Sequence, residues 1–230
     1  MQSSPIAGIS SMATRQVLAE LADAYRQRSG VMVNFESVGG VDAAKRVQAG
    51  EAFDVVVLAS EAIDKLVVAG RVAAHSKTDL VQSGVAIAVR AGAPRPEIGT
   101  EAALRQAVLA ARSIGYSTGP SGVALSALFD RWGIVESLRH RIVTPPPGVP
   151  VGTLVARGEV ELGFQQLSEL MHLDGIDVLG PLPSGTQIVT TFSAGQCTAS
   201  TRPEAVQALL EFMSSADAAE TKRRHGMSPA

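Results

Sequence analysis

Aromatic residues are scarce in this chain of 230 residues, at only 4% of the sequence. Proteins that bind single-stranded nucleic acid stack bases on aromatic rings, and this chain offers few such rings. Charged residues are also sparse, at 18%, the net charge is -2, and no long basic run is present. The positive surface of a nucleic-acid-binding protein is therefore missing as well, and we expect no nucleic acid among the partners.

Cysteine is nearly absent too, since Cys197 is the only one, which excludes an internal disulfide. We expect Cys197 to be a small buried core residue. Metal-ligand spacing is not found among the four histidines or between them and Cys197, and neither a Walker loop nor a G-x-S-x-G elbow occurs. The sequence therefore predicts no metal site and no cofactor.

No uninterrupted apolar run reaches the length of a membrane span. The segment "PIAGISSM" near the N-terminus is typical of a first strand and not of a signal peptide. Either the native protein is cytosolic or its leader is absent from this chain, and the sequence leaves both open.

Short β-branched runs alternate with helical patterns along most of the chain, and 46% hydrophobic content is enough for a sizeable core. Strands are expected at 6–10, 31–37, 54–60, 84–90, 113–117, 141–144, 160–165, 176–181 and 188–194. Helices are expected at about 14–28, ended by Gly30, and at 42–49, 61–69, 101–111, 122–132, 149–157, 203–214 and 216–225. This alternation predicts an α/β fold with a parallel sheet and helices on both faces.

One type of turn occurs five times: a strand ends, small or hydroxyl residues follow, and a helix begins. The five segments are "GISSMATRQVL", "ESVGGVDAAKRV", "VLASEAIDKL", "YSTGPSGVALS" and "PPPGVPVGTLV". In open α/β sheets ligands bind beyond the carboxyl ends of the strands, and helix N-termini favour anions. These turns predict a small anion held by amides and hydroxyls, while ordinary helix capping is the alternative explanation for each of them.

Several motifs together resemble the bacterial molybdate-binding-protein-like solute receptors. They are "ADAYRQRSGVMVNFESVGG", "AGEAFDVVVLAS", "GYSTGPSG", "GEVELGFQQLSEL" and the C-terminal "AVQALLEFMSSADAAETKRRHGM", and the resemblance spans nearly the whole chain. It implies the α/β type 2 periplasmic-binding-protein fold, with mixed sheets flanked by helices and two lobes joined by two hinge crossings. Lobe one would comprise 1–83 and 193–230, and lobe two 84–192.

The resemblance also implies ligand positions. The first serine of the family site falls on Ser11, the second on Gly40, which has no hydroxyl, and the tyrosine on Gln166. The alanine and proline of a third turn fall on Ser121 and Pro120, and a valine falls near Gly148. The expected ligand-binding residues are Ser10, Ser11, Gly39, Gly40, Ser60, Thr118, Pro120, Ser121, Gly148, Gln165 and Gln166.

Two hydroxyl ligands of the family are thus replaced, and two glutamines are gained. This pattern favours a larger carboxylate or polyol-like acid over molybdate and resembles a divergent branch that includes aconitate isomerase. We expect a periplasmic receptor that captures a small organic acid or oxyanion between its lobes for the membrane component of an ABC-type importer. The alternatives are an aconitate isomerase-like enzyme, a true molybdate or tungstate receptor, and a cytosolic ligand-sensing domain.

An isomerase would need a general base at the substrate. No histidine lies in the five turns, and the nearby acidic residues Glu36, Asp42, Glu61 and Glu169 all have surface or capping explanations. Binding without catalysis is therefore the favoured interpretation of the sequence.

Overall fold

The computed structural model describes residues 4–146 and 148–230, so Pro147 of the Pro-rich segment 144–148 lies outside the described residues. The chain forms two compact units. Unit 1 comprises Met1–Gln82 and Thr191–Ala230, and unit 2 comprises Ser83–Thr190. The sequence placed the corresponding boundaries at 83/84 and 192/193. Two strands, β4 (Thr78–Arg90) and β9 (Val189–Gln196), contain the positions at which the chain passes from one unit to the other.

The sheet of unit 1 combines three parallel strands with antiparallel neighbours. Strand β1 (Ile6–Ser11) lies between β2 (Val33–Val38) and β3 (Val55–Ala59), and β9 pairs antiparallel with β3. Every residue of β3 is buried, as its run Val-Val-Val-Leu-Ala predicts for a strand covered on both faces. The sheet is therefore mixed, as the family resemblance implied. The alternation of strands and helices alone had indicated a parallel sheet, and β9 departs from it by returning in the opposite direction.

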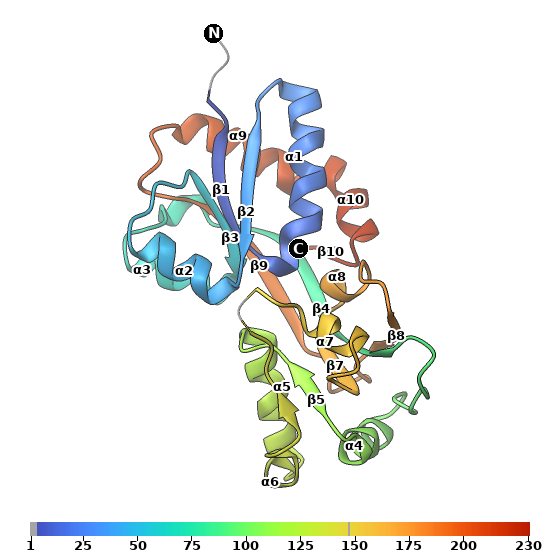
Figure 1. Ribbon diagram of the computed structural model, residues 1–230. Helices are drawn as coiled ribbons and strands as arrows, with labels where there is room; N and C mark the ends of the chain where they lie inside the picture. The colour runs from blue at the N-terminus through green and yellow to red at the C-terminus, as the bar shows by residue number, and fades with distance from the viewer. Residues whose placement is uncertain (1–3, 147) are drawn as a thin grey trace. The chain divides into compact units, whose positions relative to one another are not determined.

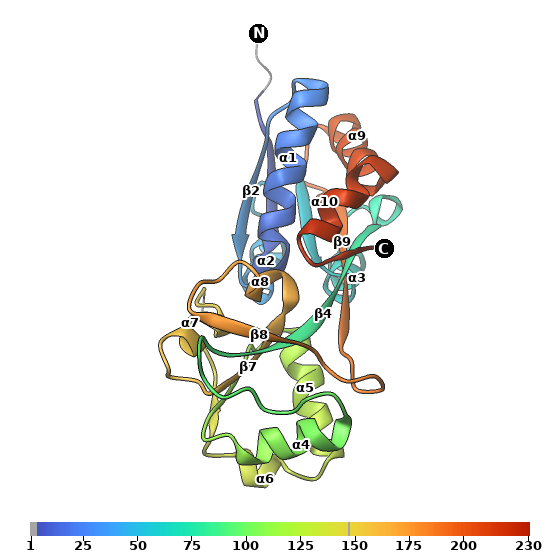
Figure 2. The ribbon, with the colours of Figure 1, turned by 90° about the vertical axis from the view of Figure 1, so that its right-hand side faces the viewer.

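Helices cover both faces of this sheet (Figures 1 and 2). On one face α1 (Arg15–Ser29) and α9 (Pro203–Ser214) pack side by side on β1, β3 and β9, with α10 (Ala219–Arg224) against α1. On the other face lie α2 (Gly40–Gln48) and α3 (Ser60–Val68). Gly30 ends α1 in the left-handed conformation at φ 74°, as predicted.

Unit 2 is built around a second mixed sheet. Strand β7 (Leu162–Gln166) pairs antiparallel with β4 and parallel with β5 (Ile114–Tyr116), which in turn pairs with β6 (Ile142–Val143). Strand β8 (Ile176–Pro181) pairs antiparallel with β4. The helices α4 (Glu101–Ala110), α5 (Pro120–Arg131) and α6 (Val135–Leu138) share one core with the sheet. Residues of α7 (Val151–Ala156) and α8 (Leu167–Leu170) belong to two smaller clusters.

The sequence located most elements but missed the shortest ones. Helices α6 and α8 have four residues each and were not predicted, because one turn shows no periodicity. The expected helix 216–225 is divided into a 3-10 turn at Ala216–Ala218 and α10. Strand β4 begins at Thr78 instead of 84, and the part before 84 includes Val81 and Gln82, which pair with the short strand β10 (Ser228–Pro229).

No helix within residues 4–146 and 148–230 is long and apolar enough to cross a membrane.

Candidate functional site: strand-to-helix turns of the two units

The carboxyl ends of β1, β2 and β3 bring the predicted residues of unit 1 to one edge of its sheet. Ser11 is in register with Val38 at the end of β2, and Ser10 with Val57 in β3. Gly39 and Gly40 directly follow β2 and begin α2, and Ser60 directly follows β3 and begins α3. The three turns that the sequence singled out in this unit therefore end at one sheet edge.

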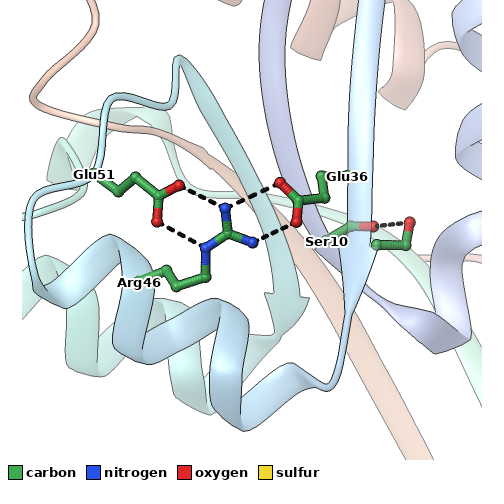
Figure 3. A network of polar contacts seen from close by, with 5 residues as sticks. Ser10, Glu36, Arg46 and Glu51 are labelled. Carbon is green, nitrogen blue, oxygen red and sulfur yellow. Dashed lines mark hydrogen bonds and ion pairs between the residues drawn. The ribbon is translucent and has the colours of Figure 1, made fainter. Parts of the chain in front are cut away.

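The two serines of β1 differ in their hydrogen bonding. The Ser10 hydroxyl pairs with the Ser37 hydroxyl at 2.8 Å (Figure 3). The Ser11 side chain is only 6% exposed, and its Oγ has no hydrogen-bond partner among the described residues. A buried hydroxyl without a hydrogen-bond partner lowers the stability of the folded protein unless a ligand or a water molecule forms a hydrogen bond with it.

The start of α2 lies beside this unpartnered hydroxyl. A methyl group added to Gly40 would lie 3.6 Å from Ser11 Cβ. The first N–H groups of a helix have no intrahelical acceptor, so α2 presents donors next to Ser11. The combination of free amides and a buried hydroxyl suits an anion.

The cationic side chain of Arg46 in α2 is already neutralised. Arg46 in α2 donates to Glu36 (2.5 and 3.0 Å) and to Glu51 (2.5 and 2.7 Å) (Figure 3). Hydrogen bonds from Arg46 lower the pKa of both carboxyl groups, so they stay ionised and keep the guanidinium occupied. Glu36 is thus an exposed ion-pair partner, as the sequence indicated, and no candidate base.

In unit 2, the turn between β5 and α5 is closed by Gly122. A methyl group at Gly122 would lie 1.6 Å from the Ser117 carbonyl oxygen and 3.2 Å from the Tyr116 ring. Only glycine therefore permits this approach of the helix start to the end of β5. Pro120 is the first residue of α5, and Ser121 follows it.

The end of β7 reaches the same edge of the unit 2 sheet. Tyr116 is in register with Phe164, so Gln165 and Gln166 extend to the level of the turn that follows β5. Gln166 is 3% exposed, its Nε2 donates to Thr190 Oγ1 at 2.9 Å, and its Oε1 has no partner among the described residues. The Thr190 hydroxyl can donate as well as accept. If the Gln166 amide is rotated by half a turn, its oxygen accepts from Thr190 and its NH2 group takes the position without a partner, where it can donate to an anion.

Gln165 is engaged at both ends of its amide. The Gly152 N–H donates to Gln165 Oε1 (3.1 Å), which fixes the amide orientation, and Gln165 Nε2 donates to Glu169 Oε1 (2.8 Å). Its side chain is therefore less available to a ligand than that of Gln166.

Glu169 differs from the surface or capping residue that the sequence suggested. It lies in α8, part-buried, and within the described residues no cation forms an ion pair with it. Burial raises its pKa to about 7, and the hydrogen bond from Gln165 opposes part of that rise. A carboxyl group of this kind can both accept and return a proton near neutral pH.

Side-chain capping does not explain the small residues of these turns. In the described part of the chain, the N-cap positions of α2, α3, α5 and α7 are Gly39, Ala59, Gly119 and Pro150, and no side-chain cap hydrogen bond is formed there. By contrast, Thr100 caps α4 through its hydroxyl.

Thr118 is exposed in the turn before α5, and Gly148 adopts φ 76° three residues before α7.

Cys197 is buried, and burial raises its pKa to about 12, so its thiol stays protonated. No group of three or more His, Cys, Asp or Glu side chains in the described ranges could hold a metal ion.

A family model described as bacterial extracellular solute-binding protein matches residues 6–228. The chain belongs to this family. A curated relative, the aconitate isomerase of Pseudomonas sp, is 41% identical over 220 residues, which cover 92% of this chain and 83% of that protein. The sequence-based resemblance to this group of proteins is therefore confirmed.

Solved structures show the same fold at low identity. The periplasmic molybdate-binding protein of Azotobacter vinelandii has a TM-score of 0.79 and 18% identity and covers 96% of this chain and 97% of its own. The sulfate-binding protein SubI of Mycobacterium tuberculosis has a TM-score of 0.80 and 17% identity, with coverage of 99% and 88%. The α/β periplasmic-binding-protein fold with mixed sheets is confirmed.

Proposed function

We propose that this protein is an isomerase of a small unsaturated tricarboxylate of the aconitate type. The observation that carries the proposal is the part-buried carboxyl of Glu169, whose Oε1 accepts a hydrogen bond from Gln165 Nε2 in β7 and whose pKa burial raises to about 7. A receptor that only binds polyanions gains nothing from such a carboxyl, since in its ionised form it repels the ligand. An enzyme that moves a proton within a bound acid needs one. The 41% identity to an aconitate isomerase supports the same assignment.

The proposed ligand contacts are neutral donors in each unit. In unit 1 they are the Ser11 hydroxyl and the first amides of α2, next to Gly40. In unit 2 they are the Gln166 amide and the first N–H groups of α5, which begin at Ser121 because Pro120 has no N–H. Glutamine amides and backbone N–H groups suit the carboxylates of an organic acid, whereas a compact tetrahedral oxyanion needs a tight nest of donors.

The reaction requires no oxidant and no cofactor. In aconitate a methylene carbon and a vinylic carbon flank one central carbon. When a base removes a methylene proton, the electron pair forms a new double bond to the central carbon, and the old double bond accepts a proton at the vinylic carbon. This shift exchanges the two ends of the molecule, so the new double bond can form in either cis or trans geometry.

The test is incubation of the purified protein with cis-aconitate and, separately, with trans-aconitate, followed by chromatographic separation of the two isomers. We expect both incubations to reach the same isomer ratio, at an initial rate proportional to protein concentration. Unchanged starting material in both incubations would contradict the proposal.

The second candidate is a non-catalytic periplasmic receptor that delivers a small anion to an ABC-type importer, as the family description favours. It predicts tight binding of an anion without chemical change. Calorimetric titration with trans-aconitate and with molybdate distinguishes the ligands: molybdate binding tighter than aconitate, together with no isomer conversion, would favour the receptor.

A further inference from the structure

A chain of two hydrogen bonds links the backbone of α7 to the carboxyl of Glu169. It begins at the Gly152 N–H, passes through the Gln165 amide, and ends at Glu169 Oε1. Gly152 has no room for a side chain, since a methyl group there would lie 2.5 Å from Leu173 Cδ1 and 3.0 Å from Leu170 Cδ2. The backbone donor that orients the amide is thus held by packing against the segment that begins with α8.

We propose that Glu169 is the catalytic base that removes and returns the proton in the isomerisation, and that Gln165 is its positioning residue. This assignment rests on the proposed function. Because the Gly152 N–H occupies Gln165 Oε1, the amide can only present its NH2 group to Glu169. The bond fixes one carboxylate oxygen, Oε1, so Oε2 is the oxygen assigned to the substrate proton.

The proton balance follows directly. Ionised Glu169 takes the proton from the substrate methylene and becomes a carboxylic acid, while the C–H electron pair enters the new double bond. The same carboxylic acid then donates its proton to the former vinylic carbon, and the carboxylate is restored. A single group that acts in both steps works best when its pKa lies near the working pH.

The ionisable groups around α8 are few. The adjoining elements β7 (Leu162–Gln166) and α7 (Val151–Ala156) contain no ionisable side chain. His172 and Asp174 follow α8, and Asp177 in β8 accepts a hydrogen bond from the Gly92 N–H at 3.2 Å. The pKa of Glu169 is set by burial and by Gln165, and not by these groups.

The experiment compares isomer conversion by the wild type, Glu169→Gln and Gln165→Leu, with Glu97→Gln as the control for the same chemical change at an exposed carboxyl of unit 2. We expect Glu169→Gln to lower kcat by about 10²-fold to 10⁴-fold while aconitate still binds in calorimetry. The amide is isosteric with the carboxyl and can still accept from Gln165, so the fold is expected to survive. Glu97→Gln is expected to match the wild type.

Gln165→Leu tests positioning through the pH profile. The bond from Gln165 lowers the pKa of Glu169, so its loss is expected to move the acidic limb of kcat/KM to higher pH and to lower kcat. A merely structural role would lower activity equally at all pH values. Gln165→Glu is the second variant, because it keeps the carbonyl oxygen that accepts from Gly152.

The outcomes separate the two proposals. If the wild type converts aconitate and Glu169→Gln keeps more than about a tenth of kcat, the base assignment is overturned and the isomerase function stands. If the wild type leaves aconitate unchanged, both are overturned. An unfolded Glu169→Gln is resolved by direct NMR titration of the Glu169 carboxyl in the wild type: a chemical shift insensitive to bound aconitate would overturn the assignment.

Discussion

Ser11 and Gln166 are buried polar residues that leave one side-chain atom without a partner in the described part of the chain. Each lies at the carboxyl end of a strand, Ser11 in β1 and Gln166 in β7. Native proteins satisfy nearly all buried polar groups, so an unsatisfied one at a sheet edge points to a ligand. The unpartnered atoms of Ser11 and Gln166 are therefore the main evidence for ligand binding at these turns.

Ser11→Ala and Ser10→Ala form a matched pair within β1. Ser11→Ala is expected to weaken the binding of trans-aconitate about tenfold, which corresponds to the loss of one hydrogen bond to a charged group. The substitution is expected to leave the free energy of unfolding unchanged. Ser10→Ala breaks the bond to Ser37 and is expected to lower the free energy of unfolding by about 1 kcal/mol. Calorimetry and urea unfolding measure the two effects, and equal aconitate affinity in wild type and Ser11→Ala would refute a ligand role for this hydroxyl.

Glu169 makes the stability depend on pH. Its pKa is raised from 4.5 to about 7 in the folded protein, so the folded state retains a proton that the unfolded chain releases. The resulting stabilisation is fully present below pH 4.5 and is lost as the pH rises through about 7. Glu169→Gln removes this dependence.

The variant should therefore gain stability relative to the wild type as the pH increases across this range. The gain is at most about 3 kcal/mol, because one pKa unit corresponds to ~1.4 kcal/mol. Urea unfolding of both proteins at about pH 5 and about pH 8 measures it. If the free energies of unfolding of the two proteins differ by the same amount at both pH values, the Glu169 carboxyl has the same pKa in the folded and unfolded states.

At the scale of the element, the turn between β5 and α5 depends on Gly122. Gly122→Ala places a methyl group against the Ser117 carbonyl and must open the turn. We expect a loss of roughly 2 kcal/mol or more in the free energy of unfolding, together with weaker aconitate binding. The control is Gly99→Ala, since Gly99 has no atom within 4 Å of the added methyl group. Similar effects of the two substitutions would argue against a closed turn.

The elements show how far the sequence could predict this structure. Runs such as Val55–Ala59 identified buried strands because β-branched residues covered on both faces leave a clear pattern. The short helix α8 left none, and the hydrogen bonds that link Gly152, Gln165 and Glu169 form only through tertiary packing. The sequence could therefore locate the strand-to-helix turns but not the part-buried carboxyl on which the proposed isomerase function depends.

At the scale of the whole molecule, the net charge of -2 gives no general attraction for anions. Binding of a polyanion must come from local donors, and it stabilises the folded state by mass action. At about 100 times its dissociation constant, trans-aconitate is expected to raise the free energy of unfolding by ~2.7 kcal/mol. Molybdate at the same concentration is expected to raise it less, and the reverse order would contradict the proposed ligand class.

The most direct measurement is proton NMR of cis-aconitate incubated with the wild-type protein in D2O. The account predicts that trans-aconitate appears at a rate proportional to protein concentration. Because Glu169 returns the proton that it removed, deuterium enters the new methylene only to the extent that this proton exchanges with the solvent during turnover. Binding of aconitate without isomer conversion would contradict the account.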